Sequence, residues 1–208
     1  NTAFITSTSR DVNPANNVAS VQTHVDGVLF VDDTAVGAND GSSWVNAYVD
    51  LQDALADAQS GDEIWVAEGT YKPTAAPSRS ASFELRSGVA LYGGFAGDEV
   101  YRRERDWMAH PTLLSGDTGT VGSSADNVYH VVSASSIDAS AVLDGFIIAG
   151  GQADGTTPDS HGGGVYAIAS GVTLRNLTLV GNSADLGGGM YNSIGDPTLV
   201  NVAFSGNT

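Results

Sequence analysis

Four oxygen-bearing side chains gather early in the chain, in a segment that contains glycine. They are Asp32, Asp33, Asn39 and Asp40. Carboxylate and amide oxygens are the ligands that a hard cation such as Ca²⁺ takes from proteins. The alternative is that Asn39-Asp40-Gly41 is simply a turn, since these residue types favour turns. The sequence therefore predicts either a calcium site or a turn here, and calcium is the one cofactor that it indicates.

The second half of the chain has few groups for acid–base chemistry on a polysaccharide. A lyase needs a base, often Arg or Lys, and usually Ca²⁺ held by acidic side chains. From Val142 to Thr208 the only basic side chain besides His161 is Arg175. A hydrolase needs two carboxylates at a set separation, and Asp144 has no acidic counterpart in the repeat described below. We therefore expect no enzymatic activity, and we expect Arg175 to lie on the exterior in solvent.

Histidine and cysteine provide no metal or nucleophile pattern. The four histidines are His24, His110, His130 and His161, which are far apart and lack metal-ligand spacing. The chain has no cysteine, which excludes disulfides, thiolate catalysis and zinc–thiolate sites. We expect the histidines to be structural or to lie at the surface.

The charge balance excludes two classes of partner. Eight basic residues against 24 acidic ones give 8 − 24 = −16. Nucleic-acid binding needs a basic footprint, and anionic membrane surfaces attract basic segments. No apolar run approaches the roughly 18 residues of a membrane helix. The sequence therefore predicts no nucleic-acid partner and no direct membrane insertion.

The elements that position these side chains come from an internal repeat. VTLRNLTLVGN, from Val172 to Asn182, matches PTLVNVAFSGN, from Pro197 to Asn207, at an offset of 25 residues. GGGVY at Gly162 and GGGMY at Gly187 have the same offset. A looser copy, VLDGFIIAGG, begins at Val142, 31 residues before the middle copy, and the polar segment 152–160 accounts for the longer spacing. Repeats of this length with strand periodicity indicate stacked supersecondary units.

A change of spacing within each copy predicts a corner. Leu177 and Leu179 follow the period of two that is typical of a strand, whereas Leu174 and Leu177 are three apart. Both can face inward only if the chain bends between them. The residues at the bend, Gly145, Asn176 and Asn201, tolerate left-handed backbone angles. We therefore predict a β-solenoid in which equivalent Asn and Tyr side chains of successive coils stack.

An amphipathic helix is predicted before the first coils. Leu51, Ala54, Leu55 and Ala58 form one apolar stripe, Asp50 or a close neighbour caps the start, and Gly61 suits the stop. Strands are predicted at 64–66, 83–85, 89–92 and 128–132. An open solenoid end exposes strand edges and an apolar core, so we expect the helix to cover that end.

These segments resemble known families. VDDTAVGANDGSSWVNAYVDLQDALADAQSGDEIWVAEGTYKPT resembles the N-terminal entry of the pectin-lyase-like, right-handed parallel β-helix superfamily. YGGFAGDE, RDW and LSGD, at 92–99, 105–107 and 114–117, resemble its bacterial surface-protein branch. GGGVY and GGGMY with VGN and FSGN are similar to repeats of polymorphic outer-membrane proteins and autotransporter-type adhesins. The resemblance covers about Val28 to Thr208 and implies an all-β right-handed parallel β-helix over residues 26–208.

Residues 1–25 differ from the rest of the chain in their sequence pattern. Two alternating stretches flank a turn-rich segment with Asp11, Pro14, Asn16 and Asn17. This segment resembles the last hairpin of an immunoglobulin-like repeat of bacterial surface proteins. The sequence leaves open whether it is the end of such a repeat or a strand exchanged between subunits. We also expect the chain to be a piece of a longer protein, because the last repeat stops at Thr208.

The fold and the resemblance together predict a role outside the cell. We expect an extracellular structural or adhesive module of a large bacterial surface protein. It would be a stiff solenoid that presents loops at 70–82, 98–110 and 152–160 to a cell-surface or matrix component, with carbohydrate as one candidate partner. Two alternatives are a subunit of a filament that binds copies of itself head-to-tail, and a non-catalytic part of a polysaccharide-lyase-like enzyme.

Overall fold

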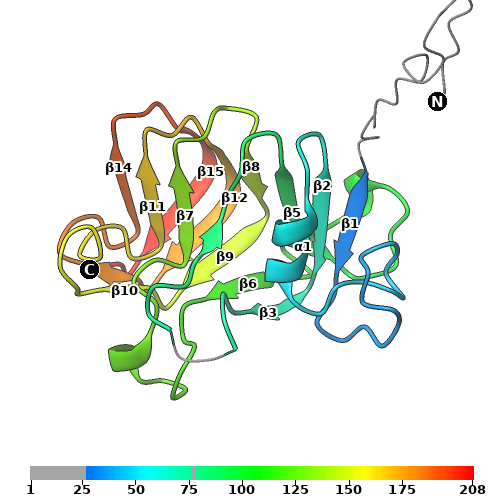
Figure 1. The fold of residues 1–208 in the computed structure, drawn as a ribbon, viewed down its shortest axis with the longest axis horizontal. Helices are drawn as coiled ribbons and strands as arrows, with labels where there is room; N and C mark the ends of the chain where they lie inside the picture. The colour runs from blue at the N-terminus through cyan, green and yellow to red at the C-terminus, as the bar shows by residue number, and fades with distance from the viewer. Residues whose placement is uncertain (1–26, 76–77) are drawn as a thin grey trace, which may run out of the picture.

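The structure, a computed structural model, describes residues 27–75 and 78–208, and almost all of its regular structure is parallel β-strand (Figure 1). The strands are β1 Val28–Val31, β2 Glu63–Ala67, β3 Gly69–Tyr71, β4 Phe83–Glu84, β5 Ala90–Phe95, β6 Thr112–Ser115, β7 Val132–Ser135, β8 Val142–Asp144, β9 Phe146–Ala149, β10 Gln152–Ala153, β11 Val165–Ile168, β12 Thr173–Val180, β13 Ser183–Ala184, β14 Met190–Ser193 and β15 Thr198–Ser205. One α-helix, α1 Leu51–Asp57, and the 3-10 turns η2 Arg102–Glu104 and η3 Ser124–Asp126 accompany them. The fold class is thus all-β with parallel strands.

The largest sheet has nine strands and is curled. Its order is β1-β2-β5-β8-β12-β9-β6-β3, with β15 paired to β12. The first half of β12 pairs with β8 and its second half pairs with β9, so β12 bends around an edge of the molecule. The bends lie at Gly145, Asn176 and Asn201, whose φ angles are 88°, 49° and 54°. The predicted left-handed corners are confirmed.

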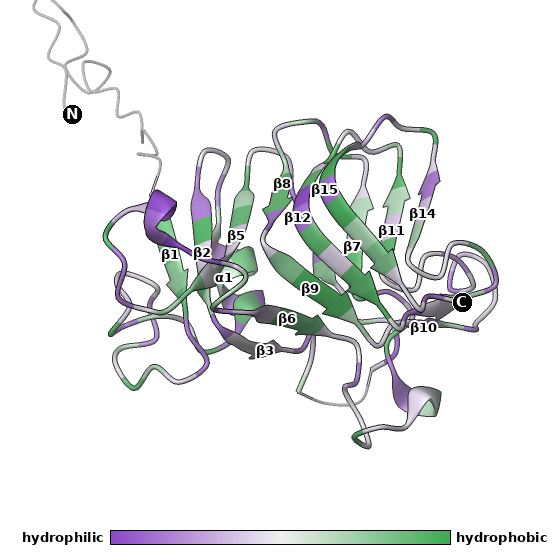
Figure 2. Cartoon of the chain, turned by 180° about the vertical axis from the view of Figure 1, so that it is seen from behind, coloured by the Kyte–Doolittle hydropathy of each residue, from purple (hydrophilic) through white to green (hydrophobic). Residues whose placement is uncertain are grey.

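Two smaller parallel sheets complete the fold. One has the order β14-β11-β7-β4 and the other pairs β10 with β13. Figure 1 shows the chain advancing along the long axis of the molecule, from β1 at one end to β15 and β14 at the other. A single apolar cluster joins the nine-stranded and four-stranded sheets, and it includes Val132, Leu143, Phe146, Val165 and Leu174. Figure 2 shows the apolar character of the curled sheet's strands β9, β12 and β15, which lie side by side.

Pairing registers confirm the repeat. Leu174 aligns with Leu199 and Tyr166 with Tyr191, both at an offset of 25. Ala153 aligns with Ala184, at an offset of 31, whereas the bridge from His161 to Leu186 has an offset of 25. The six extra residues therefore lie between 153 and 161, inside the segment predicted to hold them.

The predicted helix forms but is shorter than expected. The Asp50 side chain accepts from the backbone N–H of Gln52 at 2.9 Å, which confirms the cap, and Leu51, Ala54 and Leu55 are buried. The helix ends at Asp57 rather than near Gly61. It packs on β1, β2 and β4 near the β1 end of the nine-stranded sheet. The sequence prediction missed β1.

Another strand prediction was wrong in position. Residues 128–131 precede β7, which begins at Val132. Val128 and Val131 are fully buried, yet they belong to the approach to the strand. These valines are apolar because they are buried. A buried segment outside a strand can be as apolar as a strand, so the apolar pattern alone does not separate the two.

Stacked side chains join successive repeats, as predicted. Asn201 Nδ2 donates to Asn176 Oδ1 at 2.8 Å, and Asn182 Nδ2 donates to Asn207 Oδ1 at 3.0 Å. The Tyr166 and Tyr191 rings are stacked with centroids 6.1 Å apart, and His130 stacks on Tyr166 at 4.7 Å. Tyr166 alternates with buried Val165 and Ala167 on β11, so the aromatic ladder lies on the exterior.

The last strand exposes positions that are core elsewhere. Leu199 and Phe204 on β15 are 42% and 50% exposed, whereas their partners on β12, Leu174 and Leu179, are fully buried. Within 27–75 and 78–208, no helix is long and apolar enough to cross a membrane.

Candidate functional site

Four of the eight basic residues surround one hollow on the outer surface of the nine-stranded sheet. The hollow has a volume of about 510 Å³ and is called here the arginine hollow. It is lined by Glu63, Tyr92, Tyr101, Arg102, Arg103, Arg105, Asp144 and Arg175. Such a concentration of guanidinium groups is unexpected in a chain with a net charge of −16.

The floor of the arginine hollow comes from three neighbouring strands. Tyr92 on β5 aligns with Asp144 on β8, and Asp144 aligns with Arg175 on β12. Adjacent strands lie about 4.8 Å apart, so these side chains form a row across the sheet. Their alternation with buried Leu91, Leu143 and Leu174 directs them outward. The parallel register therefore fixes the spacing of the row.

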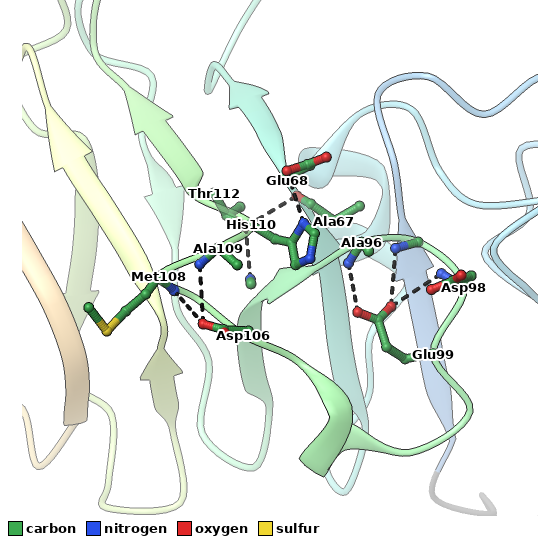
Figure 3. A network of polar contacts seen from close by, with 12 residues as sticks. Ala67, Glu68, Ala96, Asp98, Glu99, Asp106, Met108, Ala109, His110 and Thr112 are labelled. Carbon is green, nitrogen blue, oxygen red and sulfur yellow. Dashed lines mark hydrogen bonds and ion pairs between the residues drawn. The ribbon is translucent and has the colours of Figure 1, made fainter.

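The wall of the arginine hollow is the loop 96–111, which folds back over the sheet. Two of its own carboxylates hold the start of this loop. Glu99 accepts from the backbone N–H groups of Ala96 at 2.7 Å and Gly97 at 3.1 Å (Figure 3). Glu104 accepts from Val100 and Tyr101 at 3.0 and 2.9 Å. These bonds hold four backbone N–H groups of the loop, and none of them involves an arginine.

The end of the loop is held in the same way. Asp106 Oδ1 accepts from the backbone N–H groups of Met108 and Ala109 at 3.0 and 3.1 Å, and His110 Nδ1 lies 3.1 Å from Glu68 Oε2 (Figure 3). Arg102, Arg103 and Arg105 thus project from an internally bonded loop, which limits the conformational entropy lost when they bind a ligand.

Two of the four arginines are neutralised by ion pairs. Arg105 Nη2 lies 2.8 Å from Asp144 Oδ1, and both side chains are more than nine-tenths buried. Arg102 pairs with Glu63 at the rim. The lining of the arginine hollow has four guanidinium groups and two carboxylates, so its net charge is 4 − 2 = +2.

This net positive charge belongs to the two arginines without an ion pair to any described residue, Arg103 and Arg175. The Arg103 guanidinium lies 4.2 Å from the centre of the Tyr101 ring and is exposed. The exposed Arg175 side chain has no ion pair or side-chain hydrogen bond with any residue that the structure describes. Guanidinium groups form planar, bidentate bonds to carboxylate, sulfate and phosphate groups. The arginine hollow can therefore bind an oxyanion without first breaking an ion pair.

Aromatic rings flank these charges. The Tyr92 ring lies 4.5 Å from the Arg102 guanidinium carbon and 5.1 Å from that of Arg105. Burial raises the pKa of Tyr92, so its phenol stays a neutral hydrogen-bond donor at physiological pH. Trp107, 37% exposed, borders a second hollow of about 310 Å³ beside Asn176 and Asn201. Charged, aromatic and amide groups thus lie next to one another along the sheet.

The four predicted calcium ligands make separate contacts. Asp32 Oδ1 accepts from the backbone and hydroxyl of Thr34, and Asn39 Oδ1 accepts from Val49 N at 2.8 Å. Asp40 Oδ1 accepts from Ser42 N at 3.0 Å, and hydrogen bonds from Ser42 lower the pKa of Asp40. The exposed Asp33 lies beside Gly69. The bond from Ser42 N to Asp40 fits the turn predicted at Asn39-Asp40-Gly41, and calcium binding here stays a prediction.

The histidines lie in different places. His110 contacts Glu68, His130 stacks on Tyr166, and His161 stacks on Tyr191 at 4.6 Å. Burial lowers the pKa of His130. His24 and the residues 1–25 predicted to form Ig-like strands lie outside the described residues. Nowhere in the described ranges do three or more His, Cys, Asp or Glu side chains gather in a way that could hold a metal.

The sequence prediction placed Arg175 at the surface, which is correct, but it missed the arginine hollow. The available signal was the clustering of three arginines at 102, 103 and 105 in a chain with eight basic residues.

No protein-family model, curated protein or solved structure matches this chain.

Proposed function

We propose that this chain is an extracellular structural and adhesive module of a bacterial surface protein. In this proposal its parallel sheets are the faces of a right-handed parallel β-helix. The registers at offsets of 25 and 31 support this reading, because each repeat adds one strand to each sheet. Crossover connections between parallel strands of one sheet are right-handed in about 98% of cases.

The observation that carries the adhesive part is the pair of unneutralised guanidiniums in the arginine hollow. Arg103 and Arg175 come from different elements, the loop 96–111 and strand β12, yet they line the same hollow. A rigid sheet beneath an internally bonded loop is a suitable scaffold for binding. The partner proposed here is an acidic glycan of a cell surface or matrix, bound through its carboxylate or sulfate groups.

Replacing both Arg103 and Arg175 with alanine should weaken binding to such a glycan by about a hundredfold or more, since each charged hydrogen bond contributes about 1.5–3 kcal/mol and two are lost. Binding of polygalacturonate and of heparin oligosaccharides would be measured by calorimetry at low and physiological salt. Affinity should fall as salt rises.

The matched control is Arg86→Ala. Arg86 is exposed on another part of the surface, where Nη1 donates to Ala56 O at 3.5 Å. Replacing Arg86 with alanine removes one positive charge, as each replacement in the arginine hollow does. It leaves the arginine hollow itself unchanged. Equal losses in both variants, or equal binding of neutral dextran, would contradict the proposal.

A head-to-tail filament is a second candidate, favoured by the exposed apolar positions on β15. Leu199 and Phe204 would become buried if a strand of another copy paired with β15, as their partners on β12 are. Replacing both with serine should then abolish concentration-dependent polymers in analytical ultracentrifugation. A chain that stays monomeric at about 100 µM would exclude this candidate, because obligate assembly depends on protomer concentration.

A further inference from the structure

The loop between β6 and β7 has a closed neck. Val128 N donates to Gly116 O at 3.0 Å, and Thr118 Oγ1 donates to Asp126 O at 3.4 Å. These bonds pair the two arms of the loop, so Asp117 and Asn127 lie opposite each other, next to the first bond. The loop 116–128 therefore forms a compact unit at the edge of the sheet.

Two carboxylates point into this unit from opposite arms. Asp117 Oδ2 accepts from Gly122 N at 2.9 Å, and Asp126 Oδ2 accepts from Thr120 N at 2.7 Å. The two donors are two residues apart at the tip of the loop. Each carboxylate thus uses one oxygen to bind the tip and has its other oxygen left over.

Three oxygens in the loop are buried without a donor. Asp117 Oδ1, Asp126 Oδ1 and Asn127 Oδ1 are shielded from solvent, and none has a hydrogen-bond partner. Asn127 is only 7% exposed, and its Nδ2 donates to Gly150 O at 2.7 Å. That bond fixes the amide, so its carbonyl oxygen cannot rotate toward another donor.

Among the residues that the structure describes, no cation is paired with these oxygens. The sequence from 116 to 128 contains no Lys, Arg or His. Arg79 Nε donates to the backbone O of Asn127 at 2.8 Å, but the ion pair of Arg79 is with Asp154 at 2.5 Å. Oxygens that are shielded from solvent are otherwise found hydrogen-bonded or bound to metals.

We propose that the loop 116–128 binds one Ca²⁺ ion through Asp117, Asp126 and Asn127. All three ligands are oxygens, which suits a hard cation and not zinc or copper. The irregular loop suits the flexible coordination of Ca²⁺ better than the strict octahedron of Mg²⁺. This site is separate from the segment 32–40, and it does not depend on the arginine hollow.

The test uses the full chain stripped with EDTA. Calorimetric titration with CaCl₂ should show one site, and 5 mM Ca²⁺ should raise the Tm by at least about 2 °C. Replacing Asp117 and Asp126 together with asparagine should abolish both effects, because two negative charges are lost. The asparagine side chains keep an oxygen for Gly122 N and Thr120 N.

The matched control is Asp185→Asn with Asp196→Asn, which also removes two carboxylates, both exposed and outside the loop 116–128, and it should retain calcium binding. Hydrogen exchange of the unaltered chain adds a test that needs no variant: Ca²⁺ should slow exchange within 116–128. The proposal is overturned if Ca²⁺ does not bind, if binding is lost only in the control, if Mg²⁺ binds more tightly, or if protection appears elsewhere.

Discussion

Replacement of Arg105 with alanine is expected to lower the free energy of unfolding by about 3–5 kcal/mol, the usual cost of breaking a buried ion pair by removing one partner. Arg105 pairs with Asp144 at 2.8 Å and donates to the backbone oxygens of Gly93 and Asp144 at 2.9 and 3.1 Å. Without the guanidinium, the Asp144 carboxylate stays buried with Asn176 Nδ2 as its remaining side-chain donor, at 2.8 Å. The loop 96–111 also loses the bonds that Arg105 makes to β5 and β8.

Urea unfolding would measure this loss as a shift of the midpoint at constant slope. Arg103→Ala is the matched control from the same loop and should cost less than about 1 kcal/mol, since Arg103 is exposed and its side chain contacts the Tyr101 ring but no charged partner within 27–75 and 78–208. Combining Arg105→Ala with Asp144→Asn should cost less than the sum of the single changes. Additive losses would show that Arg105 acts through packing and not through the ion pair.

The repeat could be predicted because parallel stacking leaves a mark on the sequence. Residues that stack one repeat apart face the same environment, so Leu174 and Leu199, or Asn182 and Asn207, keep the same type at the same spacing. The corner at Asn176 was predictable for the same reason, since few residue types accept a φ angle of 49°. Periodicity, spacing and backbone chemistry all pointed to the same strands here.

The repeat before these was harder to predict. Ala90 on β5 pairs with Val142 on β8, a separation of 52 residues. The difference arises from the loops 96–111 and 116–131, which interrupt the repeat at both ends of β6. No sequence period survives such insertions, which explains why β7 was misplaced and why β1, before the first full repeat, was missed.

The arginine hollow was unpredictable for a related reason. Arg103 and Arg175 are 72 residues apart in the sequence and meet only because the loop 96–111 folds back over β5 and β8. The direction of a loop depends on contacts such as those of Glu99 and Asp106, which do not follow a period. Likewise, the segment 32–40 has the right residue types for calcium, but the structure shows oxygens without donors in the loop 116–128 instead.

Replacement of Asn182 with alanine is expected to lower the free energy of unfolding by about 2–6 kcal/mol. Asn182 is only 1% exposed, and its amide bonds three neighbours at once. Oδ1 accepts from Gly151 N at 2.9 Å, while Nδ2 donates to Ile148 O and to Asn207 Oδ1, both at 3.0 Å. Alanine would leave the Gly151 N–H buried without a partner, at about 1–3 kcal/mol, and would remove two further hydrogen bonds, at about 0.5–1.5 kcal/mol each.

Asn192→Ala is the matched control for this prediction, again measured by urea unfolding. Asn192 is exposed and makes one side-chain bond, to Gly195 O at 3.0 Å, so its loss should stay within about 0.5 kcal/mol. Asn207→Ala should fall between the two, because Asn207 is only half-buried although Nδ2 donates to Leu179 O at 2.8 Å and Oδ1 accepts from Asn182 N and Nδ2, both at 3.0 Å. If Asn182→Ala cost no more than Asn192→Ala, the stacked amides would not hold successive repeats together, and burial of the apolar core would have to account for their alignment alone.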